Sequence, residues 1–321
     1  MKRFALIGVA GFIAPRHLHA IRATGNDLAA AMDKFDSVGV LDQFFPKADF
    51  FIEFERFDRY LDKCRRENRG IDYLSVCTPN YLHDAHVRFG LRHGASVVCE
   101  KPLALNPWNV EALARVQEET GKDVFNILQL RLHPDIIALK EKMQGADEAQ
   151  SCDVDLTYIT PRGNWYHTSW KGDESKSGGI ATNIGIHFFD MLVWIFGSVK
   201  QNIVHVHTRD AAAGYLELER ARVRWFLSID EADLPAEVKE RGGQSLRQMK
   251  IGEQQIDFSE GFTDLHAKSY EAILDGRGYK LPEALPSIEL AHRIRTQTPA
   301  GLRGDYHPML STKKNISLHN E

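Results

Sequence analysis

Short apolar runs alternate with helical patterns through the first half of the chain, and this alternation constrains the fold most. Strands separated by helices assemble into a parallel sheet that carries helices on both faces. The alternation therefore predicts a doubly wound α/β domain over residues 1–125. The expected strands are Phe4–Ile7, Asp27–Asp33, Ile71–Cys77, Val97–Cys99 and Val124–Leu130.

Strand patterns dominate after residue 199, with helical patterns returning near the end of the chain. This order is typical of an α+β domain. We expect residues 126–321 to form that domain around a large, mostly antiparallel open sheet. The expected strands are 153–159, 202–208, 213–218, 221–229 and 248–258, and the expected late helices end near residues 274 and 296.

The composition is that of an ordinary globular protein, with 43% hydrophobic and 26% charged residues among 321. A formal net charge of −4 gives no reason to expect nucleic acid as a partner. Cys77 and Cys99 fall in apolar runs and no C-x-x-C pair occurs, which predicts reduced core cysteines and a cytoplasmic location. No signal peptide, membrane span or metal site is expected, and the polar end from Ser311 is expected to be a weakly ordered tail.

The first expected strand leads into a turn of small residues, Gly8, Gly11 and Ala14, and then into a helix. Such a turn lets the backbone approach a pyrophosphate at a helix N-terminus, so the turn, including Phe12 and Ile13, is a candidate dinucleotide site. The usual G-x-G-x-x-G spacing is not met. Asp33 ends the second strand, where an acid binds the ribose hydroxyls of NAD and repels the 2′-phosphate of NADP.

Val97–Cys99 reads as a buried strand that stops at Glu100, because Pro102 cannot extend the sheet. Lys101 then lies at the carboxyl end of a parallel strand, where open α/β sheets bind ligands. The sequence alone leaves two interpretations of Lys101: a solvated loop residue or a catalytic cation.

Residues 158–176 form an expected loop that concentrates aromatic and cationic side chains. Cations hold phosphates or carboxylates and aromatic faces stack on bases, although a loop packed over the domain explains the same composition. Asn183 and His187 follow on an expected helix, four residues apart on one face.

Three motifs in this order, Gly8-x-x-Gly11-x-x-Ala14, Cys77-Thr-Pro-Asn-x-x-His83 and Glu100-Lys-Pro, resemble the glucose-fructose oxidoreductase / inositol dehydrogenase (Gfo/Idh/MocA) family of dehydrogenases. The resemblance implies a Rossmann-type first domain that binds NAD and a second domain that binds substrate and joins subunits. Lys101 is implied to lie beside the substrate hydroxyl. The implied cofactor contacts are Gly8, Gly11, Phe12, Ile13, Asp33, Thr78, Pro79, Asn80, His83, Glu100, Lys101 and Gln129.

The family also carries a D-x-G-x-H-x-x-D motif whose acid and histidine reach the substrate. This chain has Asn183 in place of the first acid but keeps Gly185, His187 and Asp190. The implied catalytic group is Lys101, His187 and Asn183, with either Lys101 or His187 as the base.

A narrower resemblance is to the WlbA-type dehydrogenases, which oxidise UDP-N-acetylglucosaminuronate at C3 for the diacetamido-uronic acid sugars of lipopolysaccharide. It is carried by Ala10–His17, Gln129–Pro134, Asn164-Trp-Tyr and Asn183-x-Gly-x-His. It implies substrate contacts by Lys101, Arg131, Arg162, Asn164, Trp165, Tyr166, Lys171, Lys176, Asn183 and His187.

Other interpretations remain open. A family member of this fold could oxidise a free sugar or a polyol such as inositol, and a nicotinamide-binding sensor without chemistry would share the fold. A keto acid such as 2-oxoglutarate is a candidate second substrate that reoxidises NADH. Family analogy favours a homotetramer assembled through the second sheet.

Overall fold

The computed structural model describes residues 1–145, 151–257 and 264–312. Their contacts divide the chain into two compact units. The first unit contains Met1–Leu132 and Asp264–Leu285, and the second contains His133–Thr263 and Pro286–Glu321. Each unit is described separately below. The expected tail from Ser311 lies almost wholly outside the described residues.

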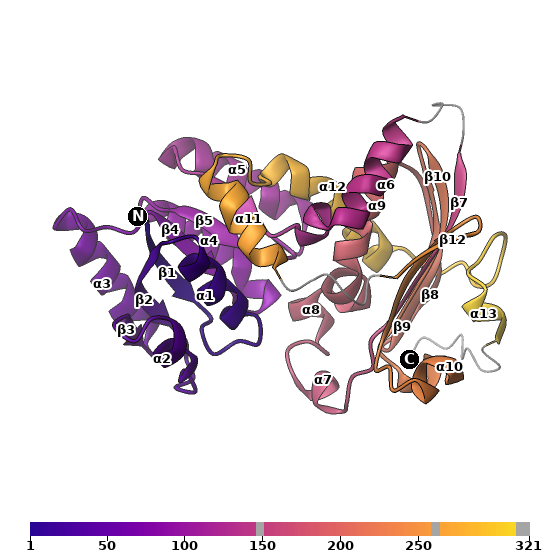
Figure 1. The fold of residues 1–321 in the computed structure, drawn as a ribbon, viewed down its shortest axis with the longest axis horizontal. Coiled ribbons are helices and arrows are strands. Elements are labelled where there is room, and N and C mark those ends of the chain that lie inside the picture. Colours follow the sequence, from indigo (N-terminus) through magenta and orange to yellow (C-terminus); the bar gives the residue numbers. More distant parts are fainter. Residues whose placement is uncertain (146–150, 258–263, 313–321) are drawn as a thin grey trace. The chain divides into compact units, whose positions relative to one another are not determined.

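The first unit contains a six-stranded parallel sheet of order β3-β2-β1-β4-β5-β6 (Figure 1). This confirms the predicted doubly wound sheet. The interior strand β5 is buried on both faces, which explains why its sequence is a continuous apolar run instead of an alternating one. The strands are β1 Arg3–Ile7, β2 Asp27–Met32, β3 Asp49–Phe51, β4 Tyr73–Val76, β5 Ser96–Cys99 and β6 Val124–Asn126.

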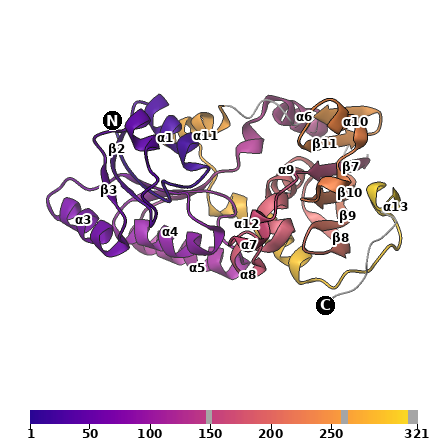
Figure 2. The ribbon, with the colours of Figure 1, turned by 90° about the horizontal axis from the view of Figure 1, so that it is seen from below.

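Helices cover both faces of this sheet: α1 and α11 lie on one side, and α3, α4 and α5 on the other (Figure 2). Helix α5 spans Pro107–Thr120; Pro107 favours its start, and Gly121, which has φ +63°, ends it. The remaining bounds are α1 Ala14–Ala23, α2 Val40–Phe44, α3 Phe54–Arg66, η1 Asn80–Leu82, α4 His83–Arg92, η2 Gln129–Leu132 and α11 Leu265–Leu274.

The segment 264–285 belongs to the first unit although it comes late in the sequence. Tyr270 and Ile273 of α11 pack into the core formed by Phe4, Leu18 and Phe125. The sequence prediction had placed every residue after 125 in the second domain. The difference arises because long-range packing, not local pattern, decides where α11 docks.

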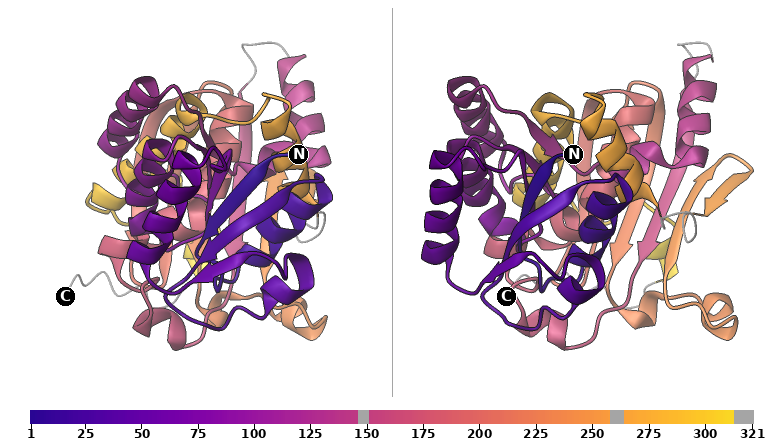
Figure 3. Two further views of the ribbon diagram at one scale, coloured as in Figure 1. Left: turned by 90° about the vertical axis from the view of Figure 1, so that its left-hand side faces the viewer. Right: turned by 60° about the vertical axis from the view of Figure 1, so that its left-hand side comes forward.

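The second unit contains a six-stranded sheet of order β12-β11-β7-β10-β9-β8. Every neighbouring pair is antiparallel except β7 with β10, so the predicted mostly antiparallel sheet is confirmed. Figure 3 shows the β11–β12 hairpin in orange at its edge. The strands are β7 Cys152–Ile159, β8 Val199–His207, β9 Ala211–Leu218, β10 Ala221–Ser228, β11 Leu246–Ile251 and β12 Gln254–Asp257.

Helices pack on both faces of the second sheet. Trp225 lies edge-on to Phe189 of α9, with ring centroids 5.2 Å apart. On the other face Leu310 of α13 packs with Phe226 and Val206. The helices of this unit are α6 Pro134–Gln144, α7 Trp165–Thr168, α8 Glu174–Ser177, η3 Ala181–Gly185, α9 Ile186–Phe196, η4 Glu231–Asp233, α10 Ala236–Glu240, α12 Leu281–Thr296, which begins in the first unit, and α13 Met309–Thr312.

Several expected elements have different forms. The strand expected over Val124–Leu130 ends at Asn126, and Gln129 to Leu132 form a 3₁₀ turn. Residues 34–55 contain α2 and β3, and the strand expected over 248–258 is a hairpin turning at Gly252, whose φ is +56°. In each case a short element or a tight turn was hidden by mixed local composition.

One helical stretch, Glu174–Phe196, is long and apolar enough by composition to cross a membrane, with mean hydropathy 1.4 in its most apolar window. In the structure 72% of that window is buried inside the protein. Gly178 and Gly179 have φ of +80° and +70°, so the backbone breaks between α8 and the apolar part. These features are ordinary for a core helix that packs on a sheet.

Gly8→Ala should destabilise the first unit more than Gly25→Ala. Both glycines have positive φ, which costs an alanine about 1–2 kcal/mol. A Cβ at Gly8 would also lie 2.7 Å from the carbonyl carbon of Cys77, whereas a Cβ at Gly25 meets nothing within 4 Å. Urea unfolding followed by circular dichroism measures the difference, and equal losses for the two variants would contradict the close packing of these turns.

Candidate functional site

The turns that follow the parallel strands meet at the carboxyl edge of the first sheet. Gly8 packs directly against the backbone of Cys77 and Thr78, and Glu100 donates its N–H to the carbonyl of Val76 at 3.0 Å. Three turns therefore meet at this edge: the glycine turn after β1 (Gly8–Ala14), the Thr78 turn after β4 (Thr78–Asn80) and the Lys101 turn after β5 (Glu100–Pro102). Ligands of open α/β sheets bind at this edge.

The glycine turn is fixed by Asp33. Asp33 Oδ2 accepts a hydrogen bond from the N–H of Ala10 at 3.0 Å, and Oδ1 accepts one from Phe35 N–H at 3.0 Å. The carboxylate thus lies beside the turn, as an acid that binds a ribose requires. Phe12 projects from the same turn with 89% of its surface exposed.

The Thr78 turn is held by buried histidine. His83 Nδ1 lies 2.6 Å from the Pro102 carbonyl oxygen, and its Nε2 lies 2.8 Å from the Thr78 carbonyl oxygen. Its ring is fully buried, and burial lowers the pKa of His83. His83 therefore links the turn after β4, at Thr78, to the turn after β5, at Pro102. Thr78 and Pro79 are partly exposed, and Asn80 is buried.

The backbone around Lys101 is fixed from several sides. Asn126 Nδ2 donates to the carbonyls of Cys99 and Glu100, at 3.0 and 3.2 Å. The Lys101 N–H donates to Glu100 Oε2 at 3.1 Å, and the following peptide bond to Pro102 is cis. Lys101 is partly exposed at the end of β5, as the sequence predicted.

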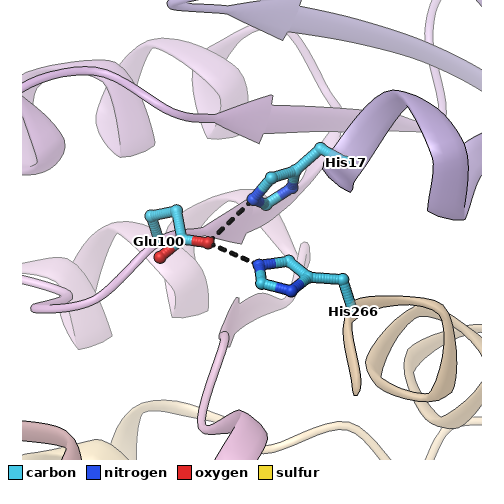
Figure 4. Close-up of side chains that lie close together, drawn as sticks. All are labelled: His17, Glu100 and His266. Carbon is cyan, nitrogen blue, oxygen red and sulfur yellow. Dashed lines mark hydrogen bonds and ion pairs between the residues drawn. The ribbon is translucent and has the colours of Figure 1, made fainter. Parts of the chain in front are cut away.

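The Glu100 carboxylate points into the unit, where two histidines hold it (Figure 4). Nε2 of His17 and Nε2 of His266 each lie 2.9 Å from Glu100 Oε1. Burial alone raises the pKa of this carboxyl, but the hydrogen bonds from the histidines outweigh burial and hold its pKa well below the usual range. Glu100, predicted as a cofactor contact, has both carboxylate oxygens engaged inside the protein.

Gln129 and Arg131 lie on the 3₁₀ turn η2, whereas the sequence predicted a strand that continues to Leu130. Both are buried. Arg131 donates Nη2–H to the carbonyl of Glu283 at 2.9 Å, and its guanidinium lies 4.9 Å from the Tyr279 ring centroid. These contacts tie η2 to the returning segment 264–285, and the predicted substrate contact by Arg131 stays a prediction.

In the second unit, Asn183 lies on a π-helical turn that precedes α9. It donates Nδ2–H to Tyr166 Oη at 2.8 Å, and both side chains are buried. The wider π turn replaces the regular α-helix that had placed Asn183 and His187 on one face. Such turns recur at functional sites. His187 is partly exposed near the start of α9.

Two cations of the loop at 158–176 lie near each other. Burial lowers the pKa of Lys171, and the neighbouring charge of Arg162 lowers it further. Lys171 Nζ lies 5.1 Å from the Trp165 ring centroid, and Trp165 is 53% exposed. Within the described part of the chain, neither cation has a carboxylate partner. An anionic ligand at this point would relieve their repulsion.

The other predicted loop residues differ in their surroundings. Lys176 is exposed and pairs with Asp173 at 2.9 Å, so its charge is already balanced. Asn164 is exposed at the start of α7. The loop is therefore not one uniform patch: Arg162, Lys171 and Trp165 differ from Lys176.

Sequence reasoning missed the buried polar residues that hydrogen-bond, directly or through one another, to Glu100 and to the backbone before Lys101. They are His17, Ser75, Asn126, His266 and Tyr270. They come from four distant parts of the sequence. A histidine inside an apolar helical pattern, as at His17, is the single local signal.

Comparison with known proteins gives two matches to one family. The model of an oxidoreductase family's NAD-binding Rossmann fold matches residues 2–127. The model of the same family's C-terminal α/β domain matches residues 147–238.

Solved structures match nearly the whole chain. A WlbA (WbpB) dehydrogenase from Thermus thermophilus, crystallised with NAD and α-ketoglutarate, is 48% identical over 96% of this chain and 99% of its own, with a TM-score of 0.93. Its complex with NAD and UDP-GlcNAcA matches at 47% identity with the same coverage and TM-score. The WlbA dehydrogenase from Bordetella pertussis, at 21% identity and a TM-score of 0.74 over 91% of this chain and 94% of its own, shows the shared fold alone.

Among curated relatives, the D-glucoside 3-dehydrogenase of Escherichia coli is 26% identical over 137 residues. That match covers 43% of this chain and 39% of the enzyme's length. The similarity is therefore partial, and it does not indicate the substrate of this chain.

Asp33→Asn should reduce the preference for NAD over NADP. Asparagine keeps the size of the side chain but removes the charge that repels a 2′-phosphate and binds ribose hydroxyls. A hydrogen bond to a charged group contributes about 1.5–3 kcal/mol, so NAD affinity should fall about tenfold or more. Titration of wild type and variant with each oxidised cofactor measures both constants. Tighter binding of NADP than NAD by the wild type would remove this role of Asp33.

Proposed function

The chain belongs to the Gfo/Idh/MocA oxidoreductase family, and on that premise we propose that it is an NAD-dependent dehydrogenase that oxidises the C3 hydroxyl of UDP-N-acetylglucosaminuronate to a ketone. The observation that carries this proposal is the 47% identity, over almost the full length of both chains, to a WlbA dehydrogenase that binds NAD and UDP-GlcNAcA.

The first unit holds NAD in this proposal. The glycine turn receives the pyrophosphate at the N-terminus of α1, and Asp33 binds the adenosine ribose. Thr78, Pro79, Asn80 and Gln129 remain the proposed neighbours of the rest of the cofactor. NAD supplies the hydride acceptor, and the residues of the chain position it and handle the proton.

Oxidation of C3 moves a hydride and a proton. The C3–H bond breaks with its electron pair, which passes to the nicotinamide as hydride, while the O–H proton passes to a base and the C3–O double bond forms. Lys101 and His187 are the proposed bases. Lys101 has the better-supported position, because Asn126, His83 and Glu100 fix the backbone on both sides of it.

The second unit supplies the proposed substrate contacts. The diphosphate and the C5 carboxylate of the substrate are anionic, and Arg162 with Lys171 forms a cation pair without a carboxylate partner in the described chain. Trp165 offers an exposed aromatic face to a base or a sugar. Asn183 and Tyr166 form a buried hydrogen-bonded pair, and both are proposed contacts of the sugar.

We also propose that a keto acid restores NAD on the enzyme. Hydride from NADH and one proton would reduce 2-oxoglutarate at C2 to 2-hydroxyglutarate. The Thermus WlbA dehydrogenase, which binds NAD together with α-ketoglutarate, supports this step.

The wider setting is part of the same proposal. A 3-keto UDP-hexuronate is a precursor for the diacetamido-uronic acid sugars of lipopolysaccharide. All four cysteines are free, which fits the reducing cytoplasm. We propose a homotetramer assembled through the second sheet, and no partnership with nucleic acid or membrane.

Lys101→Ala should retain NAD binding but lose about 10²–10⁴ in the rate of hydride transfer, because it removes a general base. His187→Ala is the paired variant. Single-turnover stopped-flow detection of NADH separates the chemical step from release. An unchanged rate in the Lys101 variant together with a large loss in the His187 variant would transfer the role of base to His187.

A substrate screen monitored by NADH absorbance tests the proposed function. We expect reduction of NAD with UDP-N-acetylglucosaminuronate and little with inositol, glucose or UDP-N-acetylglucosamine. The screen is run with and without 2-oxoglutarate, since NADH that stays bound would otherwise limit the signal. Faster turnover of inositol or a free sugar than of the UDP-hexuronate would replace this proposal with a polyol or sugar dehydrogenase.

The same assay examines the cation pair. Lys171→Ala should raise KM for the UDP-hexuronate about tenfold or more, since one charge-assisted hydrogen bond contributes about 1.5–3 kcal/mol. Lys176→Ala is the matched control, because Asp173 already balances that charge. Equal effects in the two variants would leave Lys171 without a specific role.

A further inference from the structure

The first unit contains a buried chain of polar groups beneath Lys101. Ser75 Oγ lies 2.7 Å from Tyr270 Oη, which lies 2.7 Å from His17 Nδ1. His17 Nε2 then meets Glu100 Oε1, and His266 meets the same oxygen from the other side (Figure 4). All five side chains are buried.

The protonation of this chain follows from its partners. An ionised carboxylate only accepts, so both histidines donate Nε2–H to Glu100. Burial lowers the pKa of His17, and a neutral His17 that donates through Nε2 accepts at Nδ1. Tyr270 therefore donates to His17, and Ser75 donates to Tyr270.

The three side chains His17, Glu100 and His266 also offer ligand atoms that lie within 4.8 Å of one another, as a metal site would. The hydrogen-bond geometry argues otherwise. Both nitrogens lie 2.9 Å from one oxygen, which is the length of an N–H···O⁻ bond. A metal would need the nitrogen lone pairs that face the carboxylate, whereas a hydrogen bond to an ionised carboxylate requires an N–H there.

Both histidines donate to Glu100, and the pKa of that carboxyl lies well below its usual range, so Glu100 is an ionised carboxylate inside the unit. Its third donor is the N–H of Lys101. The anion is therefore tied to the backbone of the very residue whose amine is the proposed base. A fixed anion on the adjacent residue favours the ammonium form of a lysine.

We propose that Glu100 is a positioning residue, whose carboxylate, held by His17 and His266, fixes the backbone of Lys101 and acts as a neighbouring negative charge on the titration of its amine. This inference rests on the proposed function for the role of Lys101 as base. It assigns to α11, through His266 and Tyr270, a part in the dehydrogenase site without contact to substrate.

The test measures the titration of Lys101 directly. Reductive ¹³C-methylation converts lysines to dimethyl-lysines that still titrate, and loss of one NMR signal in Lys101→Arg assigns the Lys101 resonance. In Glu100→Gln, which has nearly the same shape without the charge, the Lys101 titration midpoint should move down by about one pH unit. In Glu100→Asp, which keeps the charge, the Lys101 midpoint should stay close to that of the wild type.

Two controls separate charge from packing. Tyr270→Phe breaks the hydrogen-bond chain but leaves the carboxylate charged, so the Lys101 midpoint should stay near that of the wild type. Glu111→Gln removes an exposed carboxylate of α5 and should leave the midpoint unchanged. A Glu100→Gln midpoint equal to that of the wild type, in a protein with the native circular dichroism spectrum, would overturn the proposal.

A reciprocal measurement covers the case in which Glu100→Gln does not fold. Coupling between two charges acts equally on both. Lys101→Met removes a positive charge that stabilises the ionised Glu100, so the pKa of Glu100 in the folded protein should rise. Acid unfolding should therefore begin at a higher pH than in the wild type. An unchanged acid-unfolding midpoint would also overturn the proposal.

These readouts need no substrate. If the substrate screen fails but the Lys101 midpoint shifts, the proposed function fails and the charge coupling stands. If the screen succeeds but the midpoint does not shift, the function stands and Glu100 is structural.

Discussion

The first unit is organised around one buried negative charge. Removing a carboxylate from water is costly unless donors replace the lost hydration, and Glu100 receives three: from His17, from His266 and from the N–H of Lys101. These donors come from α1, α11 and the end of β5. The requirement to satisfy one ion therefore fixes where two helices dock and how the candidate catalytic strand ends.

Local physics made much of the fold predictable. Continuous apolar runs identified β1, β4 and β5 because a strand buried on both faces has no polar side. Pro107 and Gly121 lie at the two ends of α5, where their backbone preferences act within a few residues. Lys101 at a strand end followed from Pro102 in the same way, and the roles of the catalytic and binding residues came from resemblance, not from pattern.

The rest depended on contacts between distant parts of the sequence. Nothing near Glu100 indicates that its partner is His266, and nothing near Arg131 indicates the carbonyl of Glu283. The π turn at Asn183 reads locally as an ordinary helix, since its apolar pattern continues into α9. Such features arise from packing and from the need to pair buried polar groups, which local periodicity does not record.

The return of residues 264–285 to the first unit has a consequence for how the protein is made on the ribosome. The amino-terminal sheet emerges early, yet Tyr270 and Ile273 of its core, and His266 that binds Glu100, are translated only after most of the second unit. Until then Glu100 lacks one of its donors. Completion of the nascent first domain must wait for the carboxyl-terminal third of the message, so the two units cannot mature strictly in the order in which they are synthesised.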